Sequence, residues 1–361
     1  MPRIPNPTIL RAHQQHPLLP LLLRECRSLE SAKSELRWLH ESASRLVSSK
    51  RLARSAHTPL GWRRLLRLKC HARSKGKPLQ YILGDQPFGD LEILCKKGVL
   101  IPRTETESFT IHAARLILDD IRKHERRGGE QQERCLRIAD LCTGSGCIAL
   151  LLHALLAPHI HQLSILGIDI SPVAIGLANR NLAHNVQLGL LSNRAAADVS
   201  FRQGNVLAND GGELLAAEEV LRSVQGTPSN AEPYCDVLIS NPPYISPESF
   251  RDGTTSRSVR VFEPRLALVP MVDASDLPPG IQNEEDHFYY HIVLLSFKIH
   301  ARLVVLECGN RSQAERVAAI SRTLSSAYQL EAMSIAIWPS ARASISDHIS
   351  GNEPCVVVIH K

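Results

Sequence analysis

The chain has 361 residues, of which 42 are Lys or Arg and 36 are Asp or Glu, so its formal net charge is +6. With 43% hydrophobic and 22% charged residues, the composition is typical of a globular protein and excludes a mainly disordered chain. The length predicts more than one domain, and no apolar stretch approaches the roughly 20 residues that span a bilayer, so no membrane partner is expected.

The first acidic residue is Glu25, and the segment before it contains Arg3, Arg11 and several leucines, as organelle-import leaders do. The same segment contains five prolines and no serine, which is equally typical of a plain disordered start, so both interpretations stay open. Nine cysteines are spread along the chain without a CxxC pair, which indicates a reducing compartment without disulfides or structural zinc.

Residues 1–77 are predicted to form a helical N-terminal domain. Apolar residues recur every three or four positions between Leu22 and Leu46, which predicts one long amphipathic helix. No acid lies between Glu41 and Asp85, and the stretch 50–77 within it contains ten Lys and Arg. Such a block fits contact with ribosomal RNA, but the pattern favours a solvated helical face, because Trp62 is the one aromatic residue among the charges that could stack on a base.

Residues 78–103 are expected to form a small β-hairpin linker. Turn residues alternate there with the β-prone runs Tyr81–Leu83, Leu91–Leu94 and Val99–Ile101.

Residues 104–361 alternate strand-like with helical runs, which predicts an α/β domain with a doubly wound, mainly parallel sheet covered by helices on both faces. Three stretches rich in Gly, Pro, Ser or charge are interpreted as surface insertions: 123–133, 208–232 and 270–286. The expected strands are 136–141, 164–170, 236–240, 303–308 and 355–360, and the expected helices begin at Cys147, Pro172, Phe288 and Ser312.

The segment Asp140–Gly146 ends a predicted strand and opens a predicted helix. Its glycines, Gly144 and Gly146, let the backbone approach a ligand closely, and the helix N-terminus favours a carboxylate. Asp169 ends the next strand and can accept hydrogen bonds from both hydroxyls of a ribose. A dehydrogenase that binds NAD would use the same two features, so they leave the cofactor open.

The loop Asn241-Pro242-Pro243-Tyr244 follows another predicted strand and distinguishes between these cofactors. Its two prolines remove backbone donors, so the loop offers the Asn241 side chain and carbonyl oxygens as acceptors beside the aromatic Tyr244. A flat NH2 group can donate both hydrogens to these acceptors, which aims its nitrogen at a sulfonium methyl group. The loop therefore predicts methylation of a planar amide or amino nitrogen.

With this loop, the sequence resembles the HemK/PrmC family, which methylates the glutamine of the Gly-Gly-Gln motif in peptide chain release factors. The resemblance extends to the segments 78–84, 98–107, 262–268 and 306–309. It implies a Rossmann-like methyltransferase domain, S-adenosylmethionine as cofactor and an N-terminal domain that binds the release factor. A complete N-terminal domain is typical of the bacterial and organellar branch, so mitochondria are the expected location, with the cytoplasm as the alternative.

The resemblance also implies roles for individual residues. Those implied to hold S-adenosylmethionine are Cys142, Thr143, Gly144, Ser145, Gly146, Asp169, Asn205, Val206 and Asn241. Those implied to hold the glutamine or line the entrance are Asn241, Pro242, Pro243, Tyr244, Arg103 and Glu105, with Asn241, Pro242 and Tyr244 as the catalytic set. Asn205 stands where an acidic residue is usual, and Pro354 stands in the expected final hairpin, 347–361, where Arg is frequent.

Two other functions use the same residues. A DNA adenine-N6 methyltransferase presents the same loop to a flipped base. A catalytically silent protein would use the fold as a scaffold for ribosome binding. No metal site is expected, because His287 and His291, as well as the group His153, His159 and His161, lack a further ligand in a metal-binding pattern.

Overall fold

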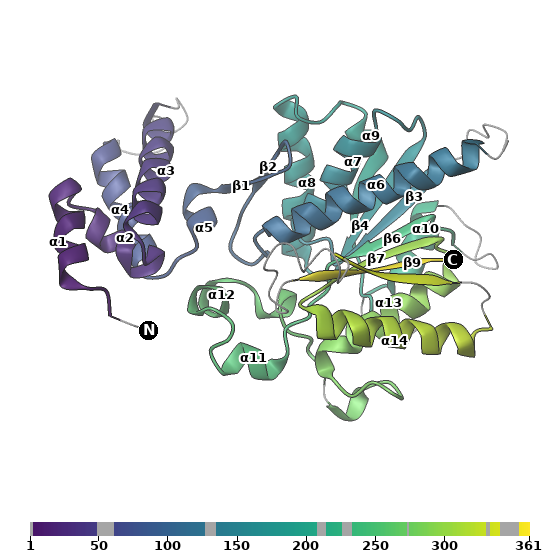
Figure 1. Ribbon diagram of the computed structural model, residues 1–361. Helices are drawn as coiled ribbons and strands as arrows, with labels where there is room; N and C mark the ends of the chain where they lie inside the picture. Colours follow the sequence, from purple (N-terminus) through teal and green to yellow (C-terminus); the bar gives the residue numbers. More distant parts are fainter. Residues whose placement is uncertain are drawn as a thin grey trace. The chain divides into compact units, whose positions relative to one another are not determined.

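The computed structural model describes residues 3–48, 61–126, 135–207, 214–225, 233–272, 274–329, 333–339 and 354–361 (Figure 1). These residues divide into two compact units. Unit 1 contains Met1–Asp85, Cys95–Lys97 and Ser256–Phe262, and unit 2 contains the segments Gln86–Leu94, Gly98–Thr255 and Glu263–Lys361. No described helix is both long and apolar enough to cross a membrane.

Unit 1 is helical, and its core is formed by apolar side chains that include Leu22, Leu23 and Leu39. The predicted single helix from Leu22 to Leu46 is wrong, because Arg27 takes a left-handed conformation (φ 63°) and ends the first segment. The Ser28 hydroxyl then accepts a hydrogen bond from the Ser31 N–H and starts a new helix. The helices are α1 (Asn6–Gln15), α2 (Leu19–Cys26), α3 (Leu29–Ser48), α4 (Trp62–Ser74), α5 (Leu79–Leu83) and α12 (Arg257–Phe262).

The basic block of the N-terminal region does not form one charged face. Lys69 is buried and donates to the Ser42 hydroxyl (2.7 Å), while Arg73 forms a two-bonded ion pair with Glu35. These two cations therefore stabilise unit 1 itself. Lys50, Arg51 and Arg54 lie outside the described residues, and the exposed members of the block are Arg63, Arg64, Arg67 and Lys75.

The predicted linker, residues 78–103, contains a hairpin that is smaller than predicted. Tyr81–Leu83 belongs to helix α5 and not to a strand, since Pro78 precedes this helix and Gly84 ends it with φ 106°. The hairpin consists of β1 (Asp85–Phe88) and β2 (Leu91–Leu94), and Val99–Ile101 is not in a strand.

Unit 2 contains a seven-stranded sheet in the order β5-β4-β3-β6-β7-β9-β8. The first five of these strands are parallel, and β9 runs antiparallel to both of its neighbours. This arrangement confirms the predicted doubly wound, mainly parallel sheet. The strands are β3 (Leu136–Leu141), β4 (Leu163–Asp169), β5 (Val199–Gln203), β6 (Val237–Ser240), β7 (Leu303–Cys308), β8 (Ser334–Trp338) and β9 (Cys355–His360).

Helices cover both faces of this sheet and enclose a separate apolar core on each side (Figure 1). One face carries α6 (Thr104–Arg126), α7 (Cys147–Leu156) and α8 (Pro172–Gln187), and the other carries α10 (Ala217–Gln225), α13 (His287–Lys298) and α14 (Arg311–Ala327). Short helices complete the unit: α9 (Ala195–Asp198), α11 (Pro247–Arg251), η2 (Arg265–Ala267), η3 (Ala274–Asp276) and η4 (Glu284–Asp286).

Several sequence-based expectations about unit 2 are wrong. The stretch 208–232 is not only an insertion, because α10 lies within it and buries Val220 and Leu221 against the sheet. The stretch 123–133 begins as the last turn of α6. The final hairpin does not start at residue 347, since the partner of β9 within the hairpin is β8, which precedes that residue. The short strands β5 and β8 were not predicted, because each shows only a brief alternation of apolar residues.

Candidate active site

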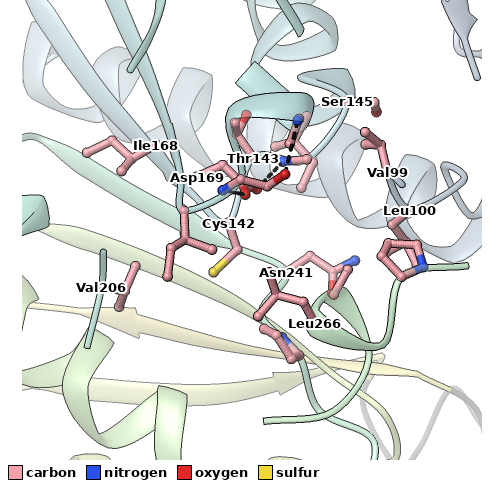
Figure 2. A pocket seen from close by; sticks show the side chains of 18 of the residues that line it. Val99, Leu100, Cys142, Thr143, Ser145, Ile168, Asp169, Val206, Asn241 and Leu266 are labelled. Carbon is pink, nitrogen blue, oxygen red and sulfur yellow. Dashed lines mark hydrogen bonds between the residues drawn. The ribbon is translucent and has the colours of Figure 1, made fainter. Parts of the chain in front are cut away.

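A cavity of about 370 Å³ lies in unit 2 at the carboxyl ends of the parallel strands. The strand order reverses at β3, which pairs with β4 on one side and β6 on the other. Ligands bind at such a switch point in open α/β sheets. Leu141 and Ser240 are register partners, so the residues that follow them, Cys142 and Asn241, emerge side by side at the cavity. Figure 2 shows the side chains of Cys142, Asp169, Val206 and Asn241 around it.

The turn after β3 requires its glycines. Gly144 and Gly146 have φ of 57° and 80°, in the region that favours glycine, and a Cβ on Gly146 would lie 2.8 Å from the Phe201 ring. The Thr143 hydroxyl donates to Asp140 Oδ2 (2.5 Å), which holds the turn to the end of β3. Burial raises the pKa of Asp140 to about 7. The N–H groups of Thr143, Gly144 and Gly146 are bound within the protein, and the glycines leave little side-chain bulk at the cavity.

Asp169 closes β4 and links two neighbouring backbone segments. Its Oδ2 accepts from the Gly144 N–H (2.8 Å) and its Oδ1 from the Ser171 N–H (2.9 Å). Burial raises its pKa, and the two backbone hydrogen bonds act in the opposite direction. A carboxylate has about four lone-pair sites, so two stay available for hydroxyl groups of a ligand.

Asn205 and Val206 follow β5 and line the same cavity. Asn205 Oδ1 accepts from the Leu207 N–H (2.9 Å), which shapes this short loop. An acceptor for an amino group at this position must therefore share its oxygen with the backbone.

The loop Asn241–Tyr244 is held at both of its ends. Asn241 Nδ2 donates to Thr106 Oγ1 (3.1 Å), so its Oδ1 is the atom left for a ligand. The Tyr244 hydroxyl donates to Glu307 Oε1 (3.2 Å). Pro242 and Pro243 are buried between these two contacts. The loop is thus a rigid set of acceptors at the end of β6.

A buried acid holds the segment on the opposite wall of the cavity. Glu263 Oε1 forms an ion pair with Arg103 Nη2 (2.7 Å), and its Oε2 accepts from the Ile101 N–H (3.1 Å). Arg103 lines the cavity, whereas Glu105 is exposed in the first turn of α6 and does not line it.

Most residues that the sequence suggests for binding meet at this one cavity. Those that line it are Arg103, Cys142, Thr143, Gly144, Ser145, Asp169, Asn205, Val206, Asn241 and Pro243. Gly146, Pro242 and Tyr244 are not in this lining, although each is adjacent in sequence to a residue that is. The sequence reading missed Thr106, Glu263 and Glu307, although each lies in a segment that carries the family resemblance.

The histidines singled out for metal binding have other contacts. His153 Nε2 lies 3.0 Å from Asp198 Oδ2, and the rings of His287 and His291 contact each other at 4.7 Å. Within the part of the chain that the structure describes, no group of three or more His, Cys, Asp or Glu residues is arranged to hold a metal ion.

The chain is similar to several known proteins. No protein family model matches the chain. The mitochondrial MRF1 N(5)-glutamine methyltransferase of Saccharomyces cerevisiae is 36% identical over 81% of this chain and 76% of its own length. A probable MRF1 mitochondrial N(5)-glutamine methyltransferase of Schizosaccharomyces pombe is 31% identical over 87% of this chain and 88% of its own length. The release factor glutamine methyltransferase of Bacillus subtilis is 32% identical over 66% of this chain and 68% of its own length.

Among solved structures, the N-terminal domain of human METTL16 is similar with 15% identity and a TM-score of 0.42, over 80% of this chain and 81% of that one.

The strand order and the cavity at its switch point define the class of the protein, a Rossmann-like methyltransferase that depends on S-adenosylmethionine. Within this class, the identity and coverage of its relatives show that the chain belongs to the HemK/PrmC family of release factor glutamine methyltransferases.

Proposed function

We propose that the protein methylates the side-chain amide nitrogen of the glutamine in the Gly-Gly-Gln motif of a peptide chain release factor. The observation that carries this proposal is the orientation of Asn241, whose Nδ2 is bound to Thr106 and whose Oδ1 is left at the cavity. An acceptor in this position suits a substrate NH2 group. The printed names of the yeast and bacterial relatives support the same substrate.

The residues around the cavity fit S-adenosylmethionine. The turn Cys142–Gly146 at the N-terminus of α7 suits its carboxylate, Asp169 suits its ribose hydroxyls, and Asn205 with Val206 suits its adenine. When bound, the cofactor supplies an electrophilic methyl group on a sulfonium.

The loop Asn241–Tyr244 performs the remaining work by positioning. A glutamine amide is a weak nucleophile, because its lone pair is delocalised into the carbonyl group. Positive charge develops on the nitrogen as the methyl group is transferred, so hydrogen bonds to Asn241 Oδ1 and to the Pro242 carbonyl strengthen in the transition state. Tyr244 packs on the planar amide. Arg103, held by Glu263, lines the entrance for the rest of the protein substrate.

Unit 1 is proposed to bind the release factor. The mitochondrion is proposed as the location of the protein, in line with the names of the two yeast relatives. Four exposed cations of its basic block, Arg63, Arg64, Arg67 and Lys75, are available for contact with ribosomal RNA. We retain the simpler interpretation that these four side chains are exposed to solvent without a bound partner.

Mass spectrometry of a Gly-Gly-Gln release factor, after incubation with enzyme and S-adenosylmethionine, tests the proposal. We expect one methyl group on the glutamine with the wild type and a loss of about 100-fold in rate with Asn241→Ala, as for the removal of one preorganised polar group at a reacting centre. Asn193→Ala, at an exposed position, is the matched control and keeps full activity.

Two outcomes would redirect the assignment. Methyl groups on adenine of added DNA, with none on glutamine, would identify a DNA adenine methyltransferase. A wild type that binds no S-adenosylmethionine in calorimetry would leave only a scaffold role.

A further inference from the structure

Two side chains outside the loop Asn241–Tyr244 hold its polar groups. Thr106 lies in the first turn of α6 and Glu307 near the end of β7, and their side chains contact Asn241 and Tyr244, respectively. We propose that Thr106 and Glu307 are positioning residues for methyl transfer: together they fix which atom of Asn241 faces the substrate and where Tyr244 lies. This inference rests on the proposed function.

The first step concerns the direction of the hydrogen bonds. An ionised carboxylate only accepts, so hydroxyl groups that face Glu307 must donate to it. Tyr244 does so at 3.2 Å. Thr106 Oγ1 is in turn the acceptor for Asn241 Nδ2 (3.1 Å).

The second step concerns the amide of Asn241. Rotating this amide by half a turn exchanges its oxygen and nitrogen, with almost no change in shape. The Nδ2 contact to Thr106 Oγ1 selects the orientation in which Oδ1 faces the cavity. The opposite orientation would present NH2 to a substrate NH2 group, and two donors would oppose each other. Thr106 thus sets the polarity of the acceptor, while Glu307 holds the other end of the loop through Tyr244.

The third step concerns Tyr244, whose ring is held against the backbone. Gly309 follows β7, and a Cβ there would lie 2.9 Å from Tyr244 Cδ2. Gln313 Oε1 accepts from the Gly309 N–H (2.8 Å), and its Nε2 donates to the Tyr244 carbonyl (3.4 Å). One element, the end of β7, therefore holds both the hydroxyl and the ring of Tyr244.

Burial of Glu307 agrees with a functional role. Glu307 is 1% exposed, and its Oε2 has no hydrogen-bond partner among the described residues. Burying a carboxylate in this way lowers the stability of the folded state. Burial raises the pKa of Glu307 to about 7, and the hydrogen bond from the Tyr244 hydroxyl lowers it. The charged and titratable groups that face it are Arg103, Glu105, Tyr244, Cys147, Tyr289 and Cys308.

The test uses the full-length protein and three variants. Glu307→Gln keeps the shape but removes the charge, Thr106→Val keeps the shape but removes the hydroxyl, and Thr106→Ser restores the hydroxyl. The readouts are kcat and KM for the release factor by mass spectrometry, and Kd for S-adenosylmethionine by calorimetry. We expect Glu307→Gln and Thr106→Val to lower kcat by about 10-fold or more, with Kd changed less than twofold. Thr106→Ser should recover most of kcat.

The pH profile separates positioning from a merely structural role. The wild-type kcat should rise with pH through an ionisation near 7, where Glu307 becomes charged, and Glu307→Gln should lack this step. The double variant of Thr106 and Glu307 should lose less than the product of the single losses, because both residues act on the same loop, Asn241–Tyr244.

Values of kcat within twofold of wild type for Thr106→Val, or a wild-type profile without this ionisation, would overturn the inference even if Glu307→Gln did not fold. Failure of the proposed function gives a different result, a wild type that does not methylate glutamine.

Discussion

Gly309 is a single residue on which the geometry of the loop Asn241–Tyr244 depends. Its backbone does not need a left-handed conformation, yet a Cβ would lie 2.9 Å from Tyr244 Cδ2 and 3.1 Å from Cε2. The ring cannot yield locally, since its hydroxyl is bound to Glu307. Space for the ring, and not backbone freedom, therefore requires glycine at this position.

Gly309→Ala should displace the Tyr244 ring by several tenths of an ångström. We expect kcat for release factor methylation to fall by about 10-fold to 100-fold, since small displacements in a reacting site are costly. Steady-state kinetics with a Gly-Gly-Gln release factor measures this loss.

The matched control is Gly176→Ala on the exposed side of α8, where nothing lies within 4 Å of the new Cβ. This variant should keep its activity and gain about 0.5 to 1 kcal/mol of stability, because alanine is the better helix former. Equal activity of the two variants would contradict the argument about Tyr244.

At the scale of elements, helix α8 supports the free edge of β2 with two buried asparagines. Asn185 accepts from the Glu92 N–H (3.0 Å) and donates to the Glu92 carbonyl (2.9 Å), as a neighbouring strand would. Asn181 accepts from the Leu94 N–H (2.8 Å) and donates to the Ser145 carbonyl (2.8 Å). The second residue therefore joins the hairpin to the turn that lines the cavity.

Asn185→Ala would leave the N–H and carbonyl of Glu92 without these partners. We expect a loss of about 2 to 3 kcal/mol in the free energy of unfolding, measured by urea denaturation. Asn179→Ala, at an exposed position of the same helix, should change it by less than about 0.5 kcal/mol. A loss of similar size in both variants would indicate a general effect on α8 and not the contact to β2.

At the scale of the whole molecule, two buried carboxyl groups of unit 2 make stability depend on pH. Burial raises the pKa of Asp140 from 3.8 to about 7 and that of Glu307 from 4.5 to about 7. Between the ordinary pKa values near 4 and the raised pKa values near 7, the folded chain binds more protons than the unfolded chain. Their contribution to stability is thus fully present below about pH 4 and is lost as the pH rises through 7.

The pH dependence should therefore weaken in Glu307→Gln. Between pH 7.5 and 5.5, we expect the wild-type free energy of unfolding to rise by about 1 to 2 kcal/mol relative to this variant, measured by thermal or urea unfolding without cofactor. Glu315→Gln, at an exposed side chain of α14, should follow the wild type. If Glu307→Gln follows the wild-type curve of stability against pH, Glu307 is already ionised throughout this range.

The sequence alone determined the features that depend on neighbouring residues. The alternation of apolar runs indicated the parallel sheet, and the Gly144–Gly146 turn, Asp169 and the loop Asn241–Tyr244 were recognisable because turn and strand-end chemistry is local. Local pattern also misled, since the apolar stripe that runs through α2 and α3 continues across the break at Arg27.

Only the tertiary structure decided what holds the loop Asn241–Tyr244. Thr106 lies 135 positions from Asn241, and Glu307 lies 63 positions from Tyr244, so no local spacing relates them. Helix α10 could not be predicted either, because it lies in a polar and glycine-rich stretch. The roles of Asn181 and Asn185 also depend on the tertiary structure, since their side chains bind the backbone of β2. The physical reason is that hydrogen-bond partners and burial are set by the packing of distant segments, which periodicity along the chain does not encode.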